Sequence, residues 1–391
     1  MGRRAFLSAN EAAAHGVKLS RPHVVAAYPI TPQTTLVEKL ADFLANGEAD
    51  FRYMMVESEH SALAAAHGAS MMGARTFTAT SSQGLLYMCE MLSYVSGSRH
   101  PVIMVDANRA TATPWNIYGD QRDSVSMRDA GWIMIYAENA QEALDMVIQS
   151  YRIGEDPAVM LPVMLNLDGF TLTHTNELVI IPEQSEVDAF LPPYETENRL
   201  CMDSPKGLCC TVGPDYHEEV RYMQQQAYEN AKGIITEIDA QFGRGFGRYY
   251  GGLVDTYMIE DADYVLIAMG SVVGTARVVV NQLREAGKKA GLIKVRSFRP
   301  FPKEQFRSLV NKFRAIGVVD RNISFGYEGA LYTEIKAAMY GSNTKMMNFI
   351  AGLGGRDISK SDIHKMYRTL FDSDSDSCPQ EVQFPGLRWK T

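Results

Sequence analysis

The stretch at residues 57–84, ESEHSALAAAHGASMMGARTFTATSSQG, places two acidic residues in front of a run of small ones. Ser58 is a helix-capping residue type, so we expect a helix to begin at Glu59, where the helix dipole favours a carboxylate. The recurring Ala and Gly let this helix approach a backbone or a flat ligand closely. Two interpretations are open from spacing alone. Glu59 complements the helix dipole, or it is an acid held at a sheet edge where α/β proteins bind ligands.

Six short apolar runs, one of them inside this stretch, alternate with helical patterns. This alternation is typical of a parallel sheet covered by helices on both faces. The fold class predicted for residues 1–190 is therefore α/β with a parallel sheet. We expect its strands at 24–28, 51–56, 74–80, 102–107, 132–137 and 158–165.

Residues 191–262 do not follow this pattern, because they contain a single helical pattern near 216–241 between stretches rich in Pro, Gly and acidic residues. We interpret them as a connecting arm that lies across another domain or subunit, since an ordered arm is costly to hold in place alone. A second α/β unit is expected at 263–372. Within it, GSVVGTA (270–276) is interpreted as a helix start, because its glycine pattern is too short for a phosphate-binding turn. An extended acidic, Pro-containing tail is expected at 373–391.

Net charge, apolar run lengths and cysteine spacing limit the partners and the cellular compartment that the sequence predicts. A net charge of −8 gives a nucleic-acid partner no electrostatic support. No run approaches about 18 uninterrupted apolar residues, so we expect neither a membrane span nor a secretion signal. The five cysteines form no C-x-x-C pair, which fits a reducing cytoplasm and predicts no metal or iron–sulfur site on this chain.

Three other predicted strand ends carry residues with useful chemistry. In YPITPQTT (28–35), two prolines stiffen the turn that holds Thr31. In TSSQG (80–84), backbone N–H groups at a helix start could receive a polar ligand. Arg109 opens a connection that is too long for a simple turn, and its planar guanidinium suits a carboxylate. The structural alternatives are an ordinary turn at Thr31 and an ion pair between Arg109 and a nearby Asp.

Together these stretches resemble the α chain of the 2-oxoacid:ferredoxin oxidoreductases, of which the pyruvate enzyme is the best known. The resemblance covers almost the whole chain and rests on YPITP, ESE with its Ala/Gly helix, TSSQG, NRATATPWNIYGDQRDS and DGF. The later AMGS and GLGGRD resemble the family's second domain. The resemblance implies an N-terminal domain that binds the pyrimidine of thiamine diphosphate, the connecting arm, and a transketolase C-terminal-like domain.

The resemblance also implies roles for individual residues. Glu59 falls on the glutamate that donates a proton to N1′ of the aminopyrimidine, and Glu57 is the competing candidate. Thr31 and Arg109 fall on the contacts to the substrate carboxylate, so the implied catalytic residues are Glu59, Arg109 and Thr31. Besides Glu59, the implied cofactor contacts are Tyr28, Pro29, Ile30, Ser82 and Gln83.

The implied activity is the oxidative decarboxylation of pyruvate or a near relative to acyl-CoA and CO2, with electrons passing to ferredoxin. A branched, aryl or 2-oxoglutarate substrate stays open, as do another acceptor such as NAD and a catalytically silent scaffold. The chain has no Gly-Asp-Gly motif and no cluster-binding cysteine set. The resemblance therefore implies that Mg²⁺ and the [4Fe-4S] clusters lie on partners: a β subunit with the diphosphate site, and γ and ferredoxin-like δ subunits.

Overall fold

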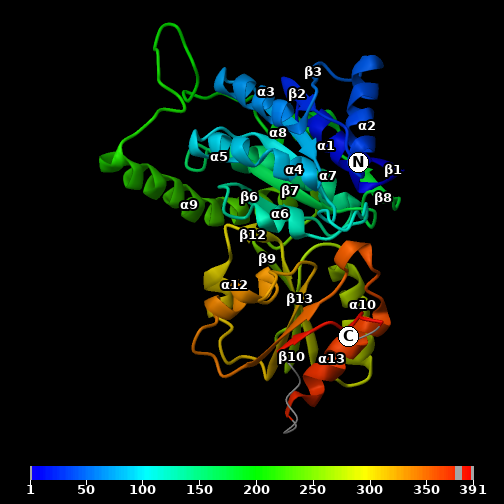
Figure 1. Ribbon diagram of the computed structural model, residues 1–391. Coiled ribbons are helices and arrows are strands. Elements are labelled where there is room, and N and C mark those ends of the chain that lie inside the picture. Colours follow the sequence, from blue (N-terminus) through cyan, green and yellow to red (C-terminus); the bar gives the residue numbers. More distant parts are fainter. Residues whose placement is uncertain (1, 375–380, 389–391) are drawn as a thin grey trace.

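The computed structural model describes residues 2–374 and 381–388, and it contains two α/β units stacked one on the other (Figure 1). The first unit is built on a seven-stranded sheet with the order β12-β6-β7-β5-β4-β2-β3. All neighbouring pairs in it are parallel except β12 with β6. Its parallel strands are β2 (Val24–Ala27), β3 (Arg52–Met55), β4 (Thr76–Thr80), β5 (Ile103–Asn108), β6 (Ile133–Tyr136) and β7 (Val163–Asp168). The predicted parallel sheet is confirmed.

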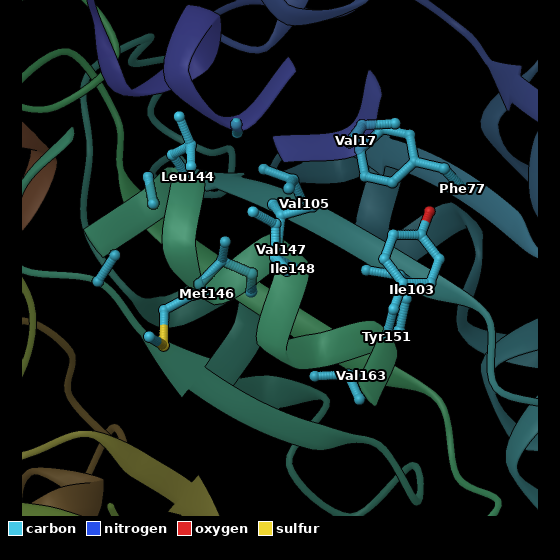
Figure 2. Packing of buried hydrophobic residues seen from close by; sticks show 14 of the residues in the cluster. Val17, Phe77, Ile103, Val105, Leu144, Met146, Val147, Ile148, Tyr151 and Val163 are labelled. Carbon is cyan, nitrogen blue, oxygen red and sulfur yellow. The ribbon is translucent and has the colours of Figure 1, made fainter. Parts of the chain in front are cut away.

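Helices cover both faces of this sheet because successive strand residues point to opposite sides. Val105 belongs to the hydrophobic cluster with α1, α2 and α7, whereas Met104 belongs to the cluster with α3, α4 and α5. Figure 2 shows the first of these clusters, where Val147, Ile148 and Tyr151 of α7 lie over the sheet. The helices of this unit are α1 (Ala9–Leu19), α2 (Thr34–Ala45), α3 (Glu59–Met71), α4 (Gln83–Tyr87), α5 (Cys89–Gly97), α6 (Arg122–Ser126), α7 (Ala140–Gly154) and α8 (Gln184–Phe190).

The second unit has a six-stranded sheet with the order β15-β14-β13-β10-β11-β9, parallel except for β9. Its helices lie on both sides of the sheet in the lower half of Figure 1. Its strands are β9 (Val254–Tyr257), β10 (Tyr264–Ala268), β11 (Ala290–Val295), β13 (Ala315–Asp320), β14 (Lys345–Ile350) and β15 (Val382–Gln383). Its helices are α10 (Val272–Glu285), α11 (Lys303–Arg307), α12 (Ala330–Ala338) and α13 (Lys360–Phe371), with short 3-10 turns η1 (Leu353–Gly355) and η2 (Asp372–Asp374).

Short strands join the sheets in places that local sequence patterns did not indicate. Strand β9 lies inside the range assigned to the arm, yet it pairs with β11. Strand β12 (Ser297–Arg299) follows β11 in the chain but pairs with β6 of the first sheet. A further two-stranded sheet, β1 (Arg3–Leu7) with β8 (Glu177–Ile181), was also not anticipated. The domain boundaries proposed from the sequence stay predictions.

The arm runs from the first unit into the long helix α9 (Pro214–Phe246). Residues 191–213 contain no helix or strand. Their first part packs on the first unit, where Tyr194 is buried and the N–H of Leu200 donates to the carbonyl of Met71 (2.8 Å). The part that follows extends away from the body as the green loop of Figure 1. The first half of α9 is exposed, and its buried face begins at Ala227. The predicted tail lies partly outside the described residues; within it, β15 pairs with β14. Among the helices that the structure describes, none is long and apolar enough to cross a membrane.

Candidate active site

Four strand ends that lie side by side form one edge of the first sheet. In the order β5-β4-β2-β3, these strands lead into Arg109, the turn 81–84, the turn 28–31 and Glu59. The carboxyl ends of parallel strands are where open α/β sheets bind ligands. The structure thus brings all the residues singled out from the sequence to one edge.

Arg109 joins two of these strand ends. Its Nη1 donates to the carbonyl of Thr31 (2.7 Å), and its Nη2 donates to Oε1 of Gln83 (3.1 Å). The side chain is only 5% exposed, and its buried Nε has no hydrogen-bond partner among the described residues. Burial lowers the pKa of Arg109, and nearby carboxylates, Glu59 among them, oppose this shift. The guanidinium therefore stays charged and keeps unused donors.

The Glu59 carboxylate is buried at the start of α3. Ser58 caps this helix by accepting the N–H of Ser61, as the sequence predicted. Glu59 is 8% exposed, and its carboxylate makes no hydrogen bond or ion pair within residues 2–374 and 381–388. A buried carboxylate without a partner is costly. This site therefore suits a ligand that shares a proton with it.

Glu57, the competing acid, has a different environment. Its side chain is exposed and accepts a hydrogen bond from the hydroxyl of Ser61. This hydrogen bond lowers the pKa of Glu57. An exposed carboxylate that is already hydrogen-bonded is poorly suited to exchanging a proton with a ring nitrogen, so the geometry favours Glu59.

Buried amides that the sequence reading missed hold the Thr31 turn. Gln33 accepts the N–H of Ile30 (3.3 Å) and donates to the carbonyl of Ala79 (3.1 Å), tying the turn to β4. Asn10 donates to the carbonyl of Pro32 (2.7 Å). The Thr31 side chain is exposed, as is that of Pro29, while Tyr28 and Ile30 are half-buried. The turn is thus fixed from behind and leaves the hydroxyl of Thr31 open at the edge.

The turn before α4 is held in an unusual conformation. Ser82 has φ 51° and ψ −123°, a region that residues other than glycine rarely adopt. Its hydroxyl lies within hydrogen-bond distance of two acceptors, the carbonyl of Ala110 (2.9 Å) and Oε1 of Gln83 (2.5 Å), and its single hydrogen serves one of them at a time. Its N–H donates to the buried carboxylate of Asp123 (3.0 Å), a residue that sequence reasoning did not single out.

The second unit contacts the first sheet through Asp168, the acid of the DGF motif, which lies at the end of β7. Its Oδ2 accepts the N–H and the hydroxyl of Ser271 (both 2.6 Å) and pairs with Nη1 of Arg321 (2.6 Å). Its Oδ1 accepts Nε2 of Gln121 (3.0 Å). Ser271 precedes α10, so GSVVGTA is a helix start that binds a carboxylate of this chain. No local signal in the sequence links Asp168 with Arg321.

The GLGGRD segment contacts the long loop that follows β5. The N–H of Gly354 donates to Asp120 (3.1 Å), and its carbonyl accepts the amide of Asn116 (2.9 Å). Trp115 on the same loop is 73% exposed. The loop is therefore anchored to the second unit while an aromatic side chain stays open to solvent or to a partner.

Comparisons with known proteins agree with this architecture. Residues 15–240 match the family described as pyruvate flavodoxin/ferredoxin oxidoreductase, thiamine diphosphate-binding. Residues 262–363 match pyruvate:ferredoxin oxidoreductase core domain II. The chain is 49% identical over 362 residues to pyruvate synthase subunit PorA of Methanothermobacter thermautotrophicus, covering 93% of this chain and 94% of that one. It is 48% identical over 360 residues to ketoisovalerate oxidoreductase subunit VorA of Pyrococcus abyssi, covering 91% of each.

A solved structure of 2-oxoglutarate:ferredoxin oxidoreductase from Magnetococcus marinus shares the fold, with a TM-score of 0.72 and 19% identity. The match covers 94% of this chain and spans 65% of the length of that one. The two family matches and the named relatives define an oxidoreductase chain with a thiamine diphosphate-binding domain. The chain belongs to the 2-oxoacid:ferredoxin oxidoreductase family and is of the α-subunit type, which confirms the resemblance seen in the sequence.

Gly84 makes room for the Glu59 carboxylate, which leads to a first prediction. A Cβ at Gly84 would lie 2.7 Å from Oε1 of Glu59 and 2.5 Å from Oγ1 of Thr80. We expect Gly84→Ala to displace the carboxylate and lower kcat of the assembled enzyme by about 10- to 100-fold. Overpacking should also reduce the free energy of unfolding by about 1–3 kcal/mol.

The matched control for this prediction is Gly68→Ala on α3. A Cβ at Gly68 meets nothing within 4 Å, so alanine there should keep kcat and stabilise the helix by about 0.5–1 kcal/mol. Steady-state kinetics and chemical denaturation of both variants measure the two effects. Equal kcat values for the two variants would show that Gly84 does not set the position of Glu59.

Proposed function

We propose that this chain is the α subunit of a thiamine diphosphate-dependent enzyme that oxidatively decarboxylates a 2-oxoacid. The products are acyl-CoA and CO2, and the electrons pass to ferredoxin. The observation that carries the proposal is the buried carboxylate of Glu59, which lacks a hydrogen-bond or ion-pair partner among the described residues and lies against Gly84. The family match to a thiamine diphosphate-binding domain supports the cofactor.

In this proposal each residue at the edge has a distinct task. Glu59 holds a proton at N1′ of the aminopyrimidine. Ser82 and Gln83, with Tyr28, Pro29 and Ile30 on the neighbouring turn, line the cofactor. When bound, thiamine diphosphate supplies the carbon nucleophile and the electron sink for decarboxylation.

Arg109 and the hydroxyl of Thr31 hold the substrate carboxylate in the proposal. The guanidinium has five N–H donors, and only two of them are used by Thr31 and Gln83. Its Nε is free of partners within the described part of the chain. Orienting the carboxylate is what a decarboxylation needs, because the bond to be broken must be aligned with the electron sink.

Pyruvate or a near relative is the proposed substrate. Relatives named for pyruvate and for ketoisovalerate are almost equally similar to this chain, at 49% and 48% identity. This supports a short aliphatic 2-oxoacid and keeps the branched acid 2-oxoisovalerate as the alternative. An aryl acid such as phenylglyoxylate, 2-oxoglutarate and an NAD-linked acceptor are the further alternatives, because Thr31 and Arg109 recognise only the carboxylate.

The chain is a subunit type found in multi-subunit complexes, as the names of its relatives state. We propose a β subunit with the diphosphate and Mg²⁺ site and a [4Fe-4S] cluster, and γ and ferredoxin-like δ subunits, in the cytoplasm. The absence of a Gly-Asp-Gly motif from the sequence supports this division. No group of three metal-ligating side chains occurs within residues 2–374 and 381–388.

The exposed half of α9 supports a contact with such a partner. Tyr216, Val220 and Met223 recur at helical spacing and are 68%, 39% and 62% exposed. They continue an apolar stripe that the chain itself buries further along the helix, at Ala227, Ala231, Ile235, Ile238 and Phe242. A single chain thus leaves part of one helix face uncovered, as expected for a subunit.

The proposed function predicts a specific reaction of the anaerobically purified native complex. With thiamine diphosphate, Mg²⁺ and CoA, we expect it to reduce a viologen dye when given one 2-oxoacid. Pyruvate, 2-oxoisovalerate, 2-oxoglutarate and phenylglyoxylate are compared in parallel, and omission of CoA is the control. The preferred acid identifies the substrate. No reduction with any acid by an intact, cluster-loaded complex would contradict the proposal.

A further inference from the structure

A fully buried carboxylate, that of Asp123 on α6, lies directly behind the candidate site. Its Oδ2 accepts two backbone N–H groups, from Ser82 (3.0 Å) and from Arg109 (2.8 Å). Ser82 precedes α4 and Arg109 follows β5, so a single oxygen atom joins two neighbouring strand ends.

The other oxygen of Asp123 is equally engaged. Oδ1 accepts the N–H of Ser124 (2.8 Å) and the amide of Asn108 (3.0 Å). Burial raises the pKa of Asp123 to about 7, and the N–H groups of Arg109 and Ser124 oppose this rise. An ionised carboxylate offers about four acceptor positions, and here four donors occupy them. The carboxylate is therefore fixed in orientation as well as in place.

The two backbone segments that Asp123 binds determine the position of the Arg109 side chain. Ser82 has a positive φ of 51°, which residues with a Cβ atom rarely adopt. The hydrogen bond from its N–H to Asp123 helps to maintain this conformation. The next residue, Gln83, accepts Nη2 of Arg109. Asp123 thus fixes the backbone from which each partner of the Arg109–Gln83 hydrogen bond extends: the backbone of Arg109 itself, and that of Ser82 next to Gln83.

We propose that Asp123 is the positioning residue of the 2-oxoacid carboxylate site. By holding the N–H groups of Ser82 and Arg109 at one oxygen, it directs the guanidinium toward the edge that Thr31 lines. This inference rests on the proposed role of Arg109 in substrate binding. Asp123 itself is buried and acts only through Arg109. Its loss therefore weakens binding of the 2-oxoacid more than it slows turnover.

The test is the Asp123→Asn variant of the complete, cofactor-loaded complex. Each oxygen of Asp123 accepts two N–H groups, but the side chain of Asn has only one acceptor oxygen. Its NH2 group then faces two N–H donors, so two of the four hydrogen bonds are lost. We expect KM for the 2-oxoacid to rise about tenfold or more, with kcat within about threefold and KM for CoA unchanged. An unchanged KM for the 2-oxoacid would overturn the proposal.

Asp106→Asn is the matched control. Asp106 is buried in the same cluster, but among the described residues it accepts a hydrogen bond only from the amide of Asn108 (2.7 Å) and holds neither Ser82 nor Arg109. Asp106→Asn should change KM for the 2-oxoacid by less than about twofold. A rise as large as that of Asp123→Asn would show that any polar change in this buried cluster raises KM, and it would contradict positioning by the hydrogen bonds of Asp123.

Two further arms separate the possible failures. If Asp123→Asn does not assemble, Asp123→Asn combined with Ser82→Gly is compared with Ser82→Gly alone, because glycine adopts the positive φ without strain. A raised KM for the 2-oxoacid in the double variant supports the proposal, and equal values overturn it.

Arg109→Lys tests the function on which the inference rests. If it raises KM for the 2-oxoacid and Asp123→Asn does not, only the positioning role fails. If neither Arg109→Lys nor Asp123→Asn raises it, both roles fail.

Discussion

Replacing Glu59 with Gln is expected to lower kcat of the assembled complex by about 100- to 10,000-fold, the range typical for loss of general acid–base catalysis. Gln has nearly the same shape and fits beside Gly84, but it cannot exchange a proton with a ring nitrogen. The carboxylate is buried and has no competing hydrogen bond or ion pair in the described chain. The carboxylate is therefore available to a bound ligand. CoA-dependent dye reduction at saturating substrate measures the effect.

Glu57→Gln is the control for this experiment, because Glu57 is exposed and lies two residues before Glu59. It should keep kcat within about twofold, since an exposed side chain contributes little to a buried site. If Glu59→Gln lowers kcat no more than the control does, Glu59 only complements the dipole of α3 and has no catalytic role. That was the alternative open from its position in the sequence.

The second large effect is expected on stability, at the contact between the two units. Arg321 is 4% exposed and pairs with Asp168, which is 1% exposed. Arg321→Met leaves a buried charge without its counterion, which costs about 3–5 kcal/mol of the free energy of unfolding. We expect the lower end, about 3 kcal/mol, because Ser271 and Gln121 still donate to Asp168. Urea denaturation of the isolated chain measures it.

Two comparisons make this prediction specific. Arg21 pairs with Asp188 on the surface, with side chains 64% and 42% exposed, so Arg21→Met should cost about 0–1 kcal/mol. Combining Arg321→Met with Asp168→Asn should recover part of the loss, because no buried charge is then left alone. If Arg321→Met is no more destabilising than Arg21→Met, the two units are not held together by this ion pair.

The sequence predicted those features that depend on local pattern. Ser58 and Glu59 begin a helix because a capping residue precedes a helix-forming run, and the parallel strands follow from short apolar runs between helices. The helix expected near 216–241 is present as the longer α9, Pro214–Phe246. A helix continues beyond the part that looks periodic, because exposed polar residues are tolerated on its first turns.

Features that depend on distant partners were not predicted. Strand β12 joins the first sheet although it follows β11 in the chain, and a three-residue segment has no periodicity to reveal this. Arg109 was expected to meet a carboxylate. The structure shows two of its donors bound to Thr31 and Gln83, contacts that exist only once three strands lie side by side. Asp123 was missed for the same reason, since its partners are backbone N–H groups without a sequence signature.

The central claim is that Glu59 activates thiamine diphosphate, and the rate of exchange of the C2 proton of the bound cofactor tests it most directly. The cofactor-loaded complex is mixed with deuterated buffer in the absence of substrate, quenched, and the remaining C2 proton is measured by NMR. We predict rapid exchange in the native complex and exchange slowed by about 100-fold or more in the Glu59→Gln complex with the cofactor still bound. Equal exchange rates in the two complexes would contradict the claim.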